Sequence, residues 1–149
     1  MRLSHQVHYG ICGVFDLAYN GHGLPVQVRV VSERQAIPAR YLEQIFQRLR
    51  RARLVASKRG PGGGYTLARP GAEITLRDIV EAVEGPLAET LRPPPPEPED
   101  TGYRPSFLWP MLAERFGAVL EEVTVDDLVR DAIRRSVRRA VPHEQMWHI

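Results

Sequence analysis

A glycine-rich run, Arg59-Gly60-Pro61-Gly62-Gly63-Gly64-Tyr65, restricts the fold of this chain more than any other feature of the sequence. Such a run cannot continue a helix, because glycine disfavours regular structure and proline lacks a backbone N–H, so the chain must turn there. The segments on either side, Leu54–Ser57 and Tyr65–Ala68, have the length and the apolar or aromatic content of short strands. The sequence therefore predicts a β-hairpin with a long glycine tip.

Two helices are predicted ahead of this hairpin. The first begins after Ser4, an N-cap candidate, and ends at Asn20-Gly21, because apolar residues recur on one helical face between these points. A short mixed segment, Val28–Ala36, follows. Pro38 then opens the second helix, since the residue before proline avoids the α region and proline suits a first helical turn. The apolar positions of the second helix have the i, i+3, i+4, i+7 spacing of a core-facing stripe: Leu42, Ile45, Phe46 and Leu49.

A further helix is predicted behind the hairpin. Thr75 and Asp78 make a start that resembles a capping box, and Gly85 marks the end. Helices followed by a β-hairpin describe a winged helix-turn-helix. We therefore expect a mainly α fold with a small β-hairpin wing, in which residues 1–85 form a winged helix-turn-helix DNA-binding domain.

The chain changes character after residue 85. Residues 86–105 are acidic and contain four consecutive prolines, Pro93 to Pro96, a composition that favours extended geometry and cannot bury a core. We expect an exposed loop there. Residues 106–149 are expected to hold a dimerisation helix near 106–121, a further helical piece from Thr124 to about Val141, and a basic C-terminal tail. The apolar stripe predicted to form the dimer interface consists of Leu108, Trp109, Leu112 and Phe116.

Charge is distributed unevenly along the chain. Residues 1–85 carry 12 Lys and Arg against 7 Asp and Glu, whereas residues 86–129 carry 3 against 9. This asymmetry suits a module that docks on phosphate with one face, although charges scattered over solvated faces would give the same counts. One cysteine, Cys12, excludes an intramolecular disulfide framework. We recognise no signal peptide and no run long enough to span a membrane, so we expect a cytoplasmic protein with no membrane partner.

Three stretches of the chain resemble a known family. They are Met1-Arg2-Leu3-Ser4, the run from Tyr41 to Arg50 (YLEQIFQRLR), and above all the wing motif from Arg59 to Tyr65. All three are similar to the Rrf2 family, the winged-helix transcription regulators of the IscR, NsrR and CymR type. The resemblance covers residues 1 to about 85 and, more weakly, Phe107 to Leu128. It implies a dimeric transcription regulator, with repression as the usual consequence of DNA binding.

The second helix of a helix-turn-helix presents its N-terminal residues to base edges in the major groove. The residue types suit this role, because arginine pairs with guanine, glutamine with adenine, and glutamate accepts from cytosine. Arginines farther along the helix suit phosphates. On the wing, glycines keep bulk away from the backbone, so that basic side chains can approach a narrow minor groove. The predicted DNA-contacting residues are Arg40, Tyr41, Glu43, Gln44, Arg48 and Arg51 on the helix, and Lys58, Arg59 and Gly60 on the wing.

These features predict a sequence-specific DNA-binding transcriptional regulator. A homodimer on a near-palindromic stretch of double-stranded DNA is expected, because one short recognition helix reads too few bases. The alternative is a protein-interaction module, in which Pro93–Pro96 recruits a partner by polyproline docking. An enzyme is not expected. No catalytic constellation is visible, and the glycine run lacks the Lys-Ser/Thr of a phosphate-binding loop and leads into a strand.

The effector of such a regulator is left open by the sequence. The resemblance implies that iron–sulfur members carry three cysteines in the loop after the wing domain. No cysteine lies in that loop here, so we expect a non-classical sensor. His5, His8 and Cys12 lie on one helical face, and their side chains suit zinc, iron or haem, with His143 and His148 as further ligands. The alternative is that the histidines are surface residues and Cys12 is a small buried hydrophobe.

Overall fold

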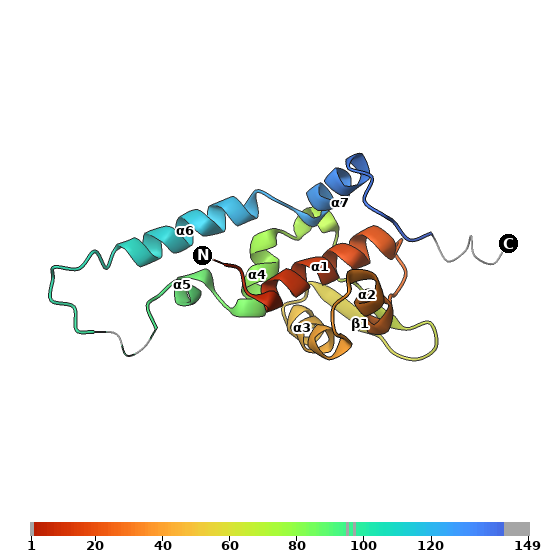
Figure 1. Ribbon diagram of the computed structural model, residues 1–149, viewed down its shortest axis with the longest axis horizontal. Helices are drawn as coiled ribbons and strands as arrows, with labels where there is room; N and C mark the ends of the chain where they lie inside the picture. Colours follow the sequence, from red (N-terminus) through yellow and green to blue (C-terminus); the bar gives the residue numbers. More distant parts are fainter. Residues whose placement is uncertain (1, 95, 97, 142–149) are drawn as a thin grey trace.

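The computed structural model describes residues 2–94, 96 and 98–141. It is mainly helical with one antiparallel hairpin, as the sequence predicts (Figure 1). The elements, in chain order, are α1 (His5–Asn20), α2 (Val28–Gln35), α3 (Ala39–Arg51), β1 (Val55–Lys58), β2 (Gly64–Leu67), the 3-10 turn η1 (Gly71–Glu73), α4 (Leu76–Glu84), α5 (Leu87–Thr90), α6 (Leu108–Glu121) and α7 (Val125–Arg134).

Side-chain caps fix where three of the helices begin. The Ser4 hydroxyl accepts a hydrogen bond of 3.2 Å from the Val7 N–H at the start of α1. Thr75 and Asp78 form a complete capping box at α4, in which each side chain bonds the backbone of the other residue, and Thr124 and Asp127 repeat this arrangement at α7. These contacts satisfy N–H groups that have no partner inside the helix. The predicted start points of α1 and α4 are therefore confirmed.

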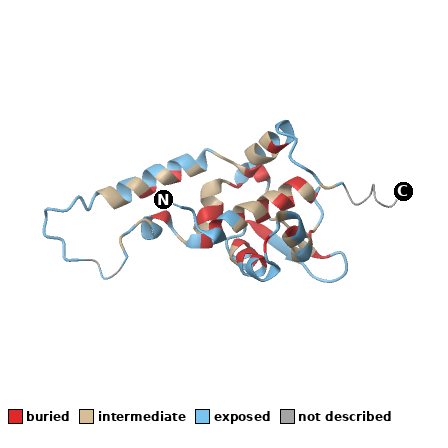
Figure 2. Cartoon of the chain, viewed as in Figure 1, coloured by how far each residue is buried: buried red, intermediate tan, exposed pale blue. Residues whose placement is uncertain are grey.

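Helix α1 runs through the middle of the domain, with α3 on one side and α7 on the other (Figure 1). Two glycines allow this close packing. A Cβ at Gly10 would lie 2.9 Å from Val83 Cγ2 of α4, and a Cβ at Gly13 would lie 3.3 Å from Phe46 Cζ of α3. Any larger side chain would push these helices away from α1. The buried residues gather where α1, α3 and α4 meet (Figure 2).

Helix α3 buries the apolar stripe predicted from the sequence. Leu42, Phe46 and Leu49 have no exposed surface, and Ile45 is only 2% exposed. Phe46 also stacks on Tyr65 of strand β2, with ring centroids 4.7 Å apart. The hairpin strands differ by one residue from the predicted segments, and their register pairs Val55 with Leu67 and Lys58 with Gly64. One core therefore fixes the hairpin to α3.

The C-terminal third packs back onto the same core. The Leu76 N–H donates to the Val123 carbonyl and the Val125 N–H donates to the Ile74 carbonyl, each over 2.9 Å. Val125 is fully buried. The division at residue 85 stays a prediction, and the hydrophobic core continues beyond it.

Two sequence expectations for this region are wrong in detail. The proline-rich segment is not loop from its first residue, because Leu87–Thr90 forms the short helix α5, whose Leu87 is buried against neighbouring helices. The last helix does not reach Val141. It ends at Arg134, where the left-handed Ser136 (φ 55°) reverses the chain and the N–H of Val137 returns to the Ala132 carbonyl.

Residues 135–141, which we term the C-terminal strap, then lie across the end of α1. Tyr19 Oη donates to the Val137 carbonyl over 2.6 Å, and the Ala140 N–H donates to Asn20 Oδ1 over 2.7 Å. Arg139 Nε donates to the Tyr19 carbonyl, and its guanidinium lies over the Tyr19 ring. The strap has no internal helix because its polar groups bond to α1 instead.

Asp16 is a fully buried carboxylate that joins α1 to α2. Arg34 binds it with two N–H donors, over 2.7 and 3.1 Å, and Gln35 Nε2 and Asn20 Nδ2 complete its hydrogen bonds over 2.9 and 3.1 Å. A buried carboxylate without these donors would be very unfavourable. This cluster sets the angle at which α2 leaves α1.

We expect Asp16→Ala to lower the free energy of unfolding by about 3 kcal/mol, because removal of one partner of a buried ion pair leaves the other without a counter-charge. Glu33→Ala is the matched control. Glu33 pairs with Arg29 on the exposed face of α2, so its loss should cost at most about 0.5 kcal/mol. Urea denaturation of both variants measures the difference, and equal stabilities would show that the Asp16 cluster does not hold α1 to α2.

Candidate nucleic-acid interface

Helix α3 presents a polar face opposite its buried stripe. Arg40, Glu43, Gln44 and Arg51 are all exposed on this face, as predicted. Gln47 is exposed between them. Gln47 is not among the predicted DNA-contacting residues, although its helical spacing from Gln44 and Arg51 indicates the same face.

The turn between α2 and α3 sets the direction of this face. Ala36 caps α2 in the left-handed conformation (φ 54°), and Ile37 is buried at 4% exposure directly after it. The N–H groups of Tyr41 and Leu42 then bond to the Pro38 carbonyl, which begins α3. A left-handed residue followed by a buried one reverses the chain sharply, so α2 and α3 form the helix-turn-helix pair.

Arg40 and Tyr41 form a connected pair at the start of α3. Arg40 Nη2 donates to Tyr41 Oη over 3.0 Å, and the guanidinium carbon lies 4.8 Å from the centre of the Tyr41 ring. Tyr41 in turn stacks on Tyr9 of α1, with centroids 6.5 Å apart. The arginine side chain is thus oriented before any ligand arrives, which lowers the entropy lost on contact.

Arg48 differs from the other basic residues of α3, because its partners are internal. Its Nη1 donates to Gln6 Oε1 over 2.8 Å and to the Val83 carbonyl over 3.0 Å. The latter carbonyl lies in the last turn of α4, where cations are favoured. The predicted phosphate contact of Arg48 stays a prediction, whereas its observed contacts join α3 to α1 and α4.

The wing projects its tip away from the core. Lys58, Arg59 and Gly60 are all exposed, and the tip is closed by the Gly63 N–H, which donates to the Gly60 carbonyl over 2.9 Å. The base of the wing is joined to the segment before α2 by two backbone bonds between Val26 and Tyr65, over 2.8 and 2.9 Å. No sequence pattern indicates this bridge, which fixes the wing relative to the helix-turn-helix.

The predicted dimer stripe divides between two environments on α6. Leu108, Trp109 and Leu112 are partly exposed, whereas Phe116 packs against the domain core beside the buried Ala113 and Gly117. Three further apolar residues of this helix region are exposed and were missed by the sequence analysis: Phe107 (70% exposed), Met111 (37%) and Val119 (61%).

The proposed sensor residues His5, His8 and Cys12 all lie on α1, and their role in metal binding stays a prediction. His5 and His8 are exposed on α1, on either side of Tyr9, with ring centroids 5.9 and 6.1 Å from the tyrosine ring. Cys12 is half-buried against the core, and burial, followed by the charge of Asp16, raises the pKa of its thiol. Over residues 2–94, 96 and 98–141, no three His, Cys, Asp or Glu side chains cluster as metal ligands. His143 and His148 lie outside the described residues.

A model of one protein family matches residues 3–131, and its description is "Rrf2: Iron-dependent Transcriptional regulator". The chain belongs to the Rrf2 family. Two solved structures with similar folds are T. potens IscR (34% identity, TM-score 0.68, covering 89% of this chain and 88% of that one) and CymR, titled the global cysteine regulator of B. subtilis (31%, 0.69, 87% and 97%). The winged-helix fold predicted for this Rrf2 protein is confirmed.

Relatives that match in sequence are also transcriptional regulators. The HTH-type transcriptional regulator IscR of Serratia proteamaculans is 38% identical over 133 residues, which are 88% of this chain and 80% of the relative. The IscR of Photobacterium profundum is 37% identical, with 88% and 77% covered. These relatives are transcriptional regulators and not enzymes. Within the described part of this Rrf2 chain, no helix combines the length and apolar character needed to cross a membrane.

A cysteine-ligated iron–sulfur cluster does not fit this member of the family. The segment between α5 and α6, where the resemblance places the cluster thiolates, has no cysteine, and Cys12 on α1 is the single cysteine of the chain. A single cysteine cannot supply the several thiolates that hold such a cluster. Besides its prolines, this segment carries arginine, acidic and hydroxyl side chains.

Gly64 tests the attachment of the wing. A Cβ there would lie 2.4 Å from both the carbonyl carbon and the oxygen of Val26, at a φ of 142°. We expect Gly64→Ala to lower the free energy of unfolding by about 2–3 kcal/mol and to break the Val26–Tyr65 bridge. The reason is that the backbone of the wing and the backbone at Val26 must both move to make room for the Cβ.

Gly62→Ala is the control, since that residue has a φ of 71° but nothing within 4 Å of its Cβ position. It should cost only about 1–2 kcal/mol. Urea denaturation gives both costs, and hydrogen exchange at the Tyr65 N–H reports the bridge. A bridge amide protected equally in both variants would contradict the proposed attachment.

Proposed function

We propose that this Rrf2 regulator binds double-stranded DNA as a homodimer, with α3 in the major groove and the wing in the adjacent minor groove. The observation that carries the proposal is the exposed polar face of α3 beside a rigidly attached wing with Lys58 and Arg59 at its tip. Such a face presents guanidinium, amide and carboxylate groups, the side chains that distinguish base pairs in the major groove. A narrow minor groove attracts arginine, which suits the wing.

Arg40 and Arg51 have different roles in this proposal. Arg40 lies at the N-terminal end of α3, which enters the groove, and is oriented by Tyr41. Arg51 lies at the C-terminal end and is exposed, at a position that suits phosphate. Base contacts specify the sequence, whereas phosphate contacts position the protein. We further propose that the bound dimer represses transcription by occupying its promoter.

We expect Arg40→Ala to reduce the preference for a selected operator over random DNA by about 1–3 kcal/mol and to leave binding to random DNA unchanged. The operator comes from selection on a pool of random duplexes, and fluorescence anisotropy gives both affinities. Arg130→Ala is the matched control, because Arg130 lies on α7, on the other side of α1 from α3 (Figure 1). Equal losses on operator and random DNA would make Arg40 a phosphate ligand.

Homodimerisation is proposed from the apolar surface of α6. Phe107, Met111 and Val119 are exposed along this helix, and Leu108 and Leu112 are partly exposed beside them. An apolar face of this extent is unusual on a small monomer, and a two-fold pair of α6 helices would cover both copies. Figure 2 shows that the exposed parts of α6 continue along most of its length.

We expect Val119→Asp to produce a folded monomer with weaker operator binding, because a carboxylate would be buried without a partner in the dimer. Val119 is 61% exposed in the single chain, so the substitution should leave the fold of the monomer intact. Ile133→Asp on α7, at 53% exposure, is the control and should stay dimeric. Sedimentation equilibrium gives the mass, and a wild-type protein that sediments as a monomer at micromolar concentration would refute the proposal.

A further inference from the structure

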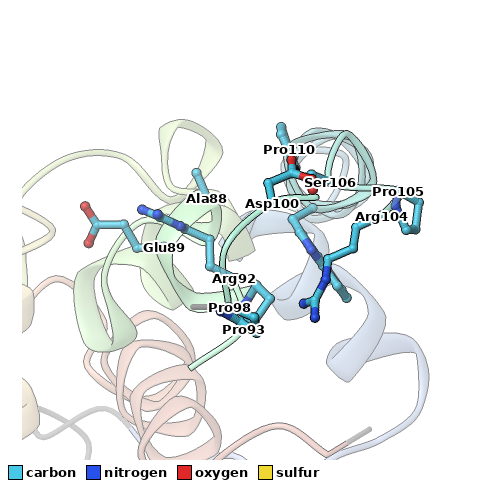
Figure 3. A pocket seen from close by; sticks show the side chains of 11 residues that line it. Ala88, Glu89, Arg92, Pro93, Pro98, Asp100, Arg104, Pro105, Ser106 and Pro110 are labelled. Atoms are coloured by element: carbon cyan, nitrogen blue, oxygen red, sulfur yellow. Dashed lines mark hydrogen bonds between the residues drawn. The ribbon is translucent and has the colours of Figure 1, made fainter. Parts of the chain in front are cut away.

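A cavity of about 750 Å³ lies between the end of α5, the start of α6 and the segment that joins them. Figure 3 shows Pro93 and Pro98 on one side of it and Arg104 and Pro105 on the other. The indole of Trp109 contributes to the lining. The described residues between Thr90 and Leu108 form no helix or strand, and long connections of this kind are uncommon in a compact domain and often functional.

The walls of this cavity suit a planar apolar body. Trp109 is only partly exposed, and the rings of Pro93, Pro98 and Pro105 offer flat faces. Proline side chains lose almost no rotamer entropy when a ligand covers them, and an indole ring favours stacking. The volume is within the range of ordinary ligand pockets.

Four charged residues line the cavity: Glu89 and Asp100 are acidic, and Arg92 and Arg104 are basic. Asp100 is already engaged, because it accepts hydrogen bonds from the Gly102 N–H over 2.9 Å and from Ser106 Oγ over 3.0 Å. The bond from Gly102, helped by that from Ser106, lowers the pKa of the Asp100 carboxyl. Arg104 makes no direct hydrogen bond or salt bridge within the described parts of the chain, although its charge also contributes to the lowered pKa of the Asp100 carboxyl. Its guanidinium has five donors, arranged to bind a carboxylate with two of them.

We propose that this cavity is an effector site for a small aromatic carboxylate, with the ring against Trp109 and the prolines and the carboxylate on Arg104. Arginine is better suited than lysine to this role, because its planar fork matches the two carboxylate oxygens. The N-terminal end of α6, where the helix dipole is positive, lies at the same end of the cavity.

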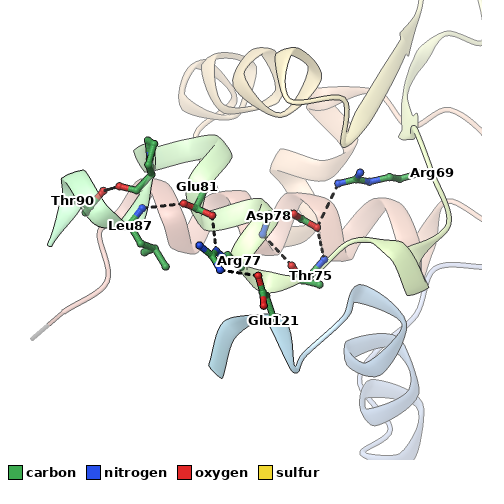
Figure 4. A network of polar contacts seen from close by, with 9 residues as sticks. Arg69, Thr75, Arg77, Asp78, Glu81, Leu87, Thr90 and Glu121 are labelled. Atoms are coloured by element: carbon green, nitrogen blue, oxygen red, sulfur yellow. Dashed lines mark hydrogen bonds and ion pairs between the residues drawn. The ribbon is translucent and has the colours of Figure 1, made fainter. Parts of the chain in front are cut away.

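The two helices that flank the cavity, α5 and α6, are joined to α4 by one polar network (Figure 4). Glu81 accepts from the Leu87 N–H of α5 over 3.0 Å and from Arg77 Nε over 2.7 Å. Arg77 Nη1 then donates to Glu121 of α6 over 2.7 Å, and the guanidinium lies against Gly117, where any side chain would collide with it. A ligand that changes the spacing of α5 and α6 therefore acts on α4.

Helix α4 carries the change to the DNA-binding face. It packs against α3, and its Val83 carbonyl accepts from Arg48 of that helix. We therefore expect ligand in the cavity to change operator affinity, a step that rests on the proposed DNA-binding function. Binding of the ligand itself does not depend on that function.

Tryptophan fluorescence tests the site in the absence of DNA. The chain has two tryptophans, so Trp147→Phe leaves Trp109 as the only one. In this background, benzoate should change the fluorescence in a saturable way. Benzamide, which has the same ring without the charge, should bind at least about tenfold more weakly, because a charge-assisted contact is lost.

Arg104→Gln should weaken benzoate binding at least about tenfold and leave benzamide binding unchanged. Arg130→Gln is the matched control for lost positive charge and should bind benzoate normally. Arg104 is exposed and makes no internal bond among the described residues, so the variant should fold. Fluorescence that does not saturate by about 10 mM benzoate, or equal affinities in wild type and Arg104→Gln, would overturn the site.

Operator binding measured with and without saturating benzoate tests the coupling separately. Glu121→Gln should bind benzoate as the wild type does but show a smaller effect of benzoate on operator affinity. The reason is that the contact with Arg77 loses the negative charge of the Glu121 carboxylate. Benzoate that binds without changing the operator affinity of a DNA-binding protein would overturn the coupling. A protein that binds benzoate and no DNA would instead refute the proposed function and leave the site standing.

Discussion

The close approach of α1 to its neighbours is the constraint on which the rest of the structure depends. Gly10 and Gly13 allow α1 to approach α4 and α3 closely, and α1 also packs against α2, α7 and β2. The buried Asp16 then fixes α2 against the same helix through Arg34. Because the interior is close-packed, a shift of α1 would be felt by the helix-turn-helix, the wing and the strap together.

The candidate DNA-binding surface follows from that packing. Once the apolar stripe of α3 is buried against α1, the polar residues of α3 have only the solvent side left. Tyr65 places the wing beside them, since it stacks on Phe46 and bonds to Val26. The contacts of Tyr65 thus help to fix the base of the wing beside α3, whereas nothing lies within 4 Å of the Cβ positions of Gly60 and Gly62 at the tip.

The segment between α5 and α6 gives this Rrf2 protein its individual chemistry. It lacks the thiols that a cysteine-ligated cluster needs, and it forms a cavity with an arginine and a tryptophan in its lining. The two helices that flank the cavity, α5 and α6, are both joined to α4 by the network of Arg77, Glu81 and Glu121.

The sequence by itself determined the local structure: the caps at Ser4 and Thr75, the buried stripe of α3, and the hairpin at the glycine run. Each of these depends on residues a few positions apart, whose spacing can be read directly. Only the tertiary structure decided that α5 forms, that the strap binds the end of α1, that Arg48 bonds inward, and that Arg104 and Trp109 share a cavity. These outcomes depend on contacts between distant segments, and neither propensity nor spacing carries information about which surfaces meet.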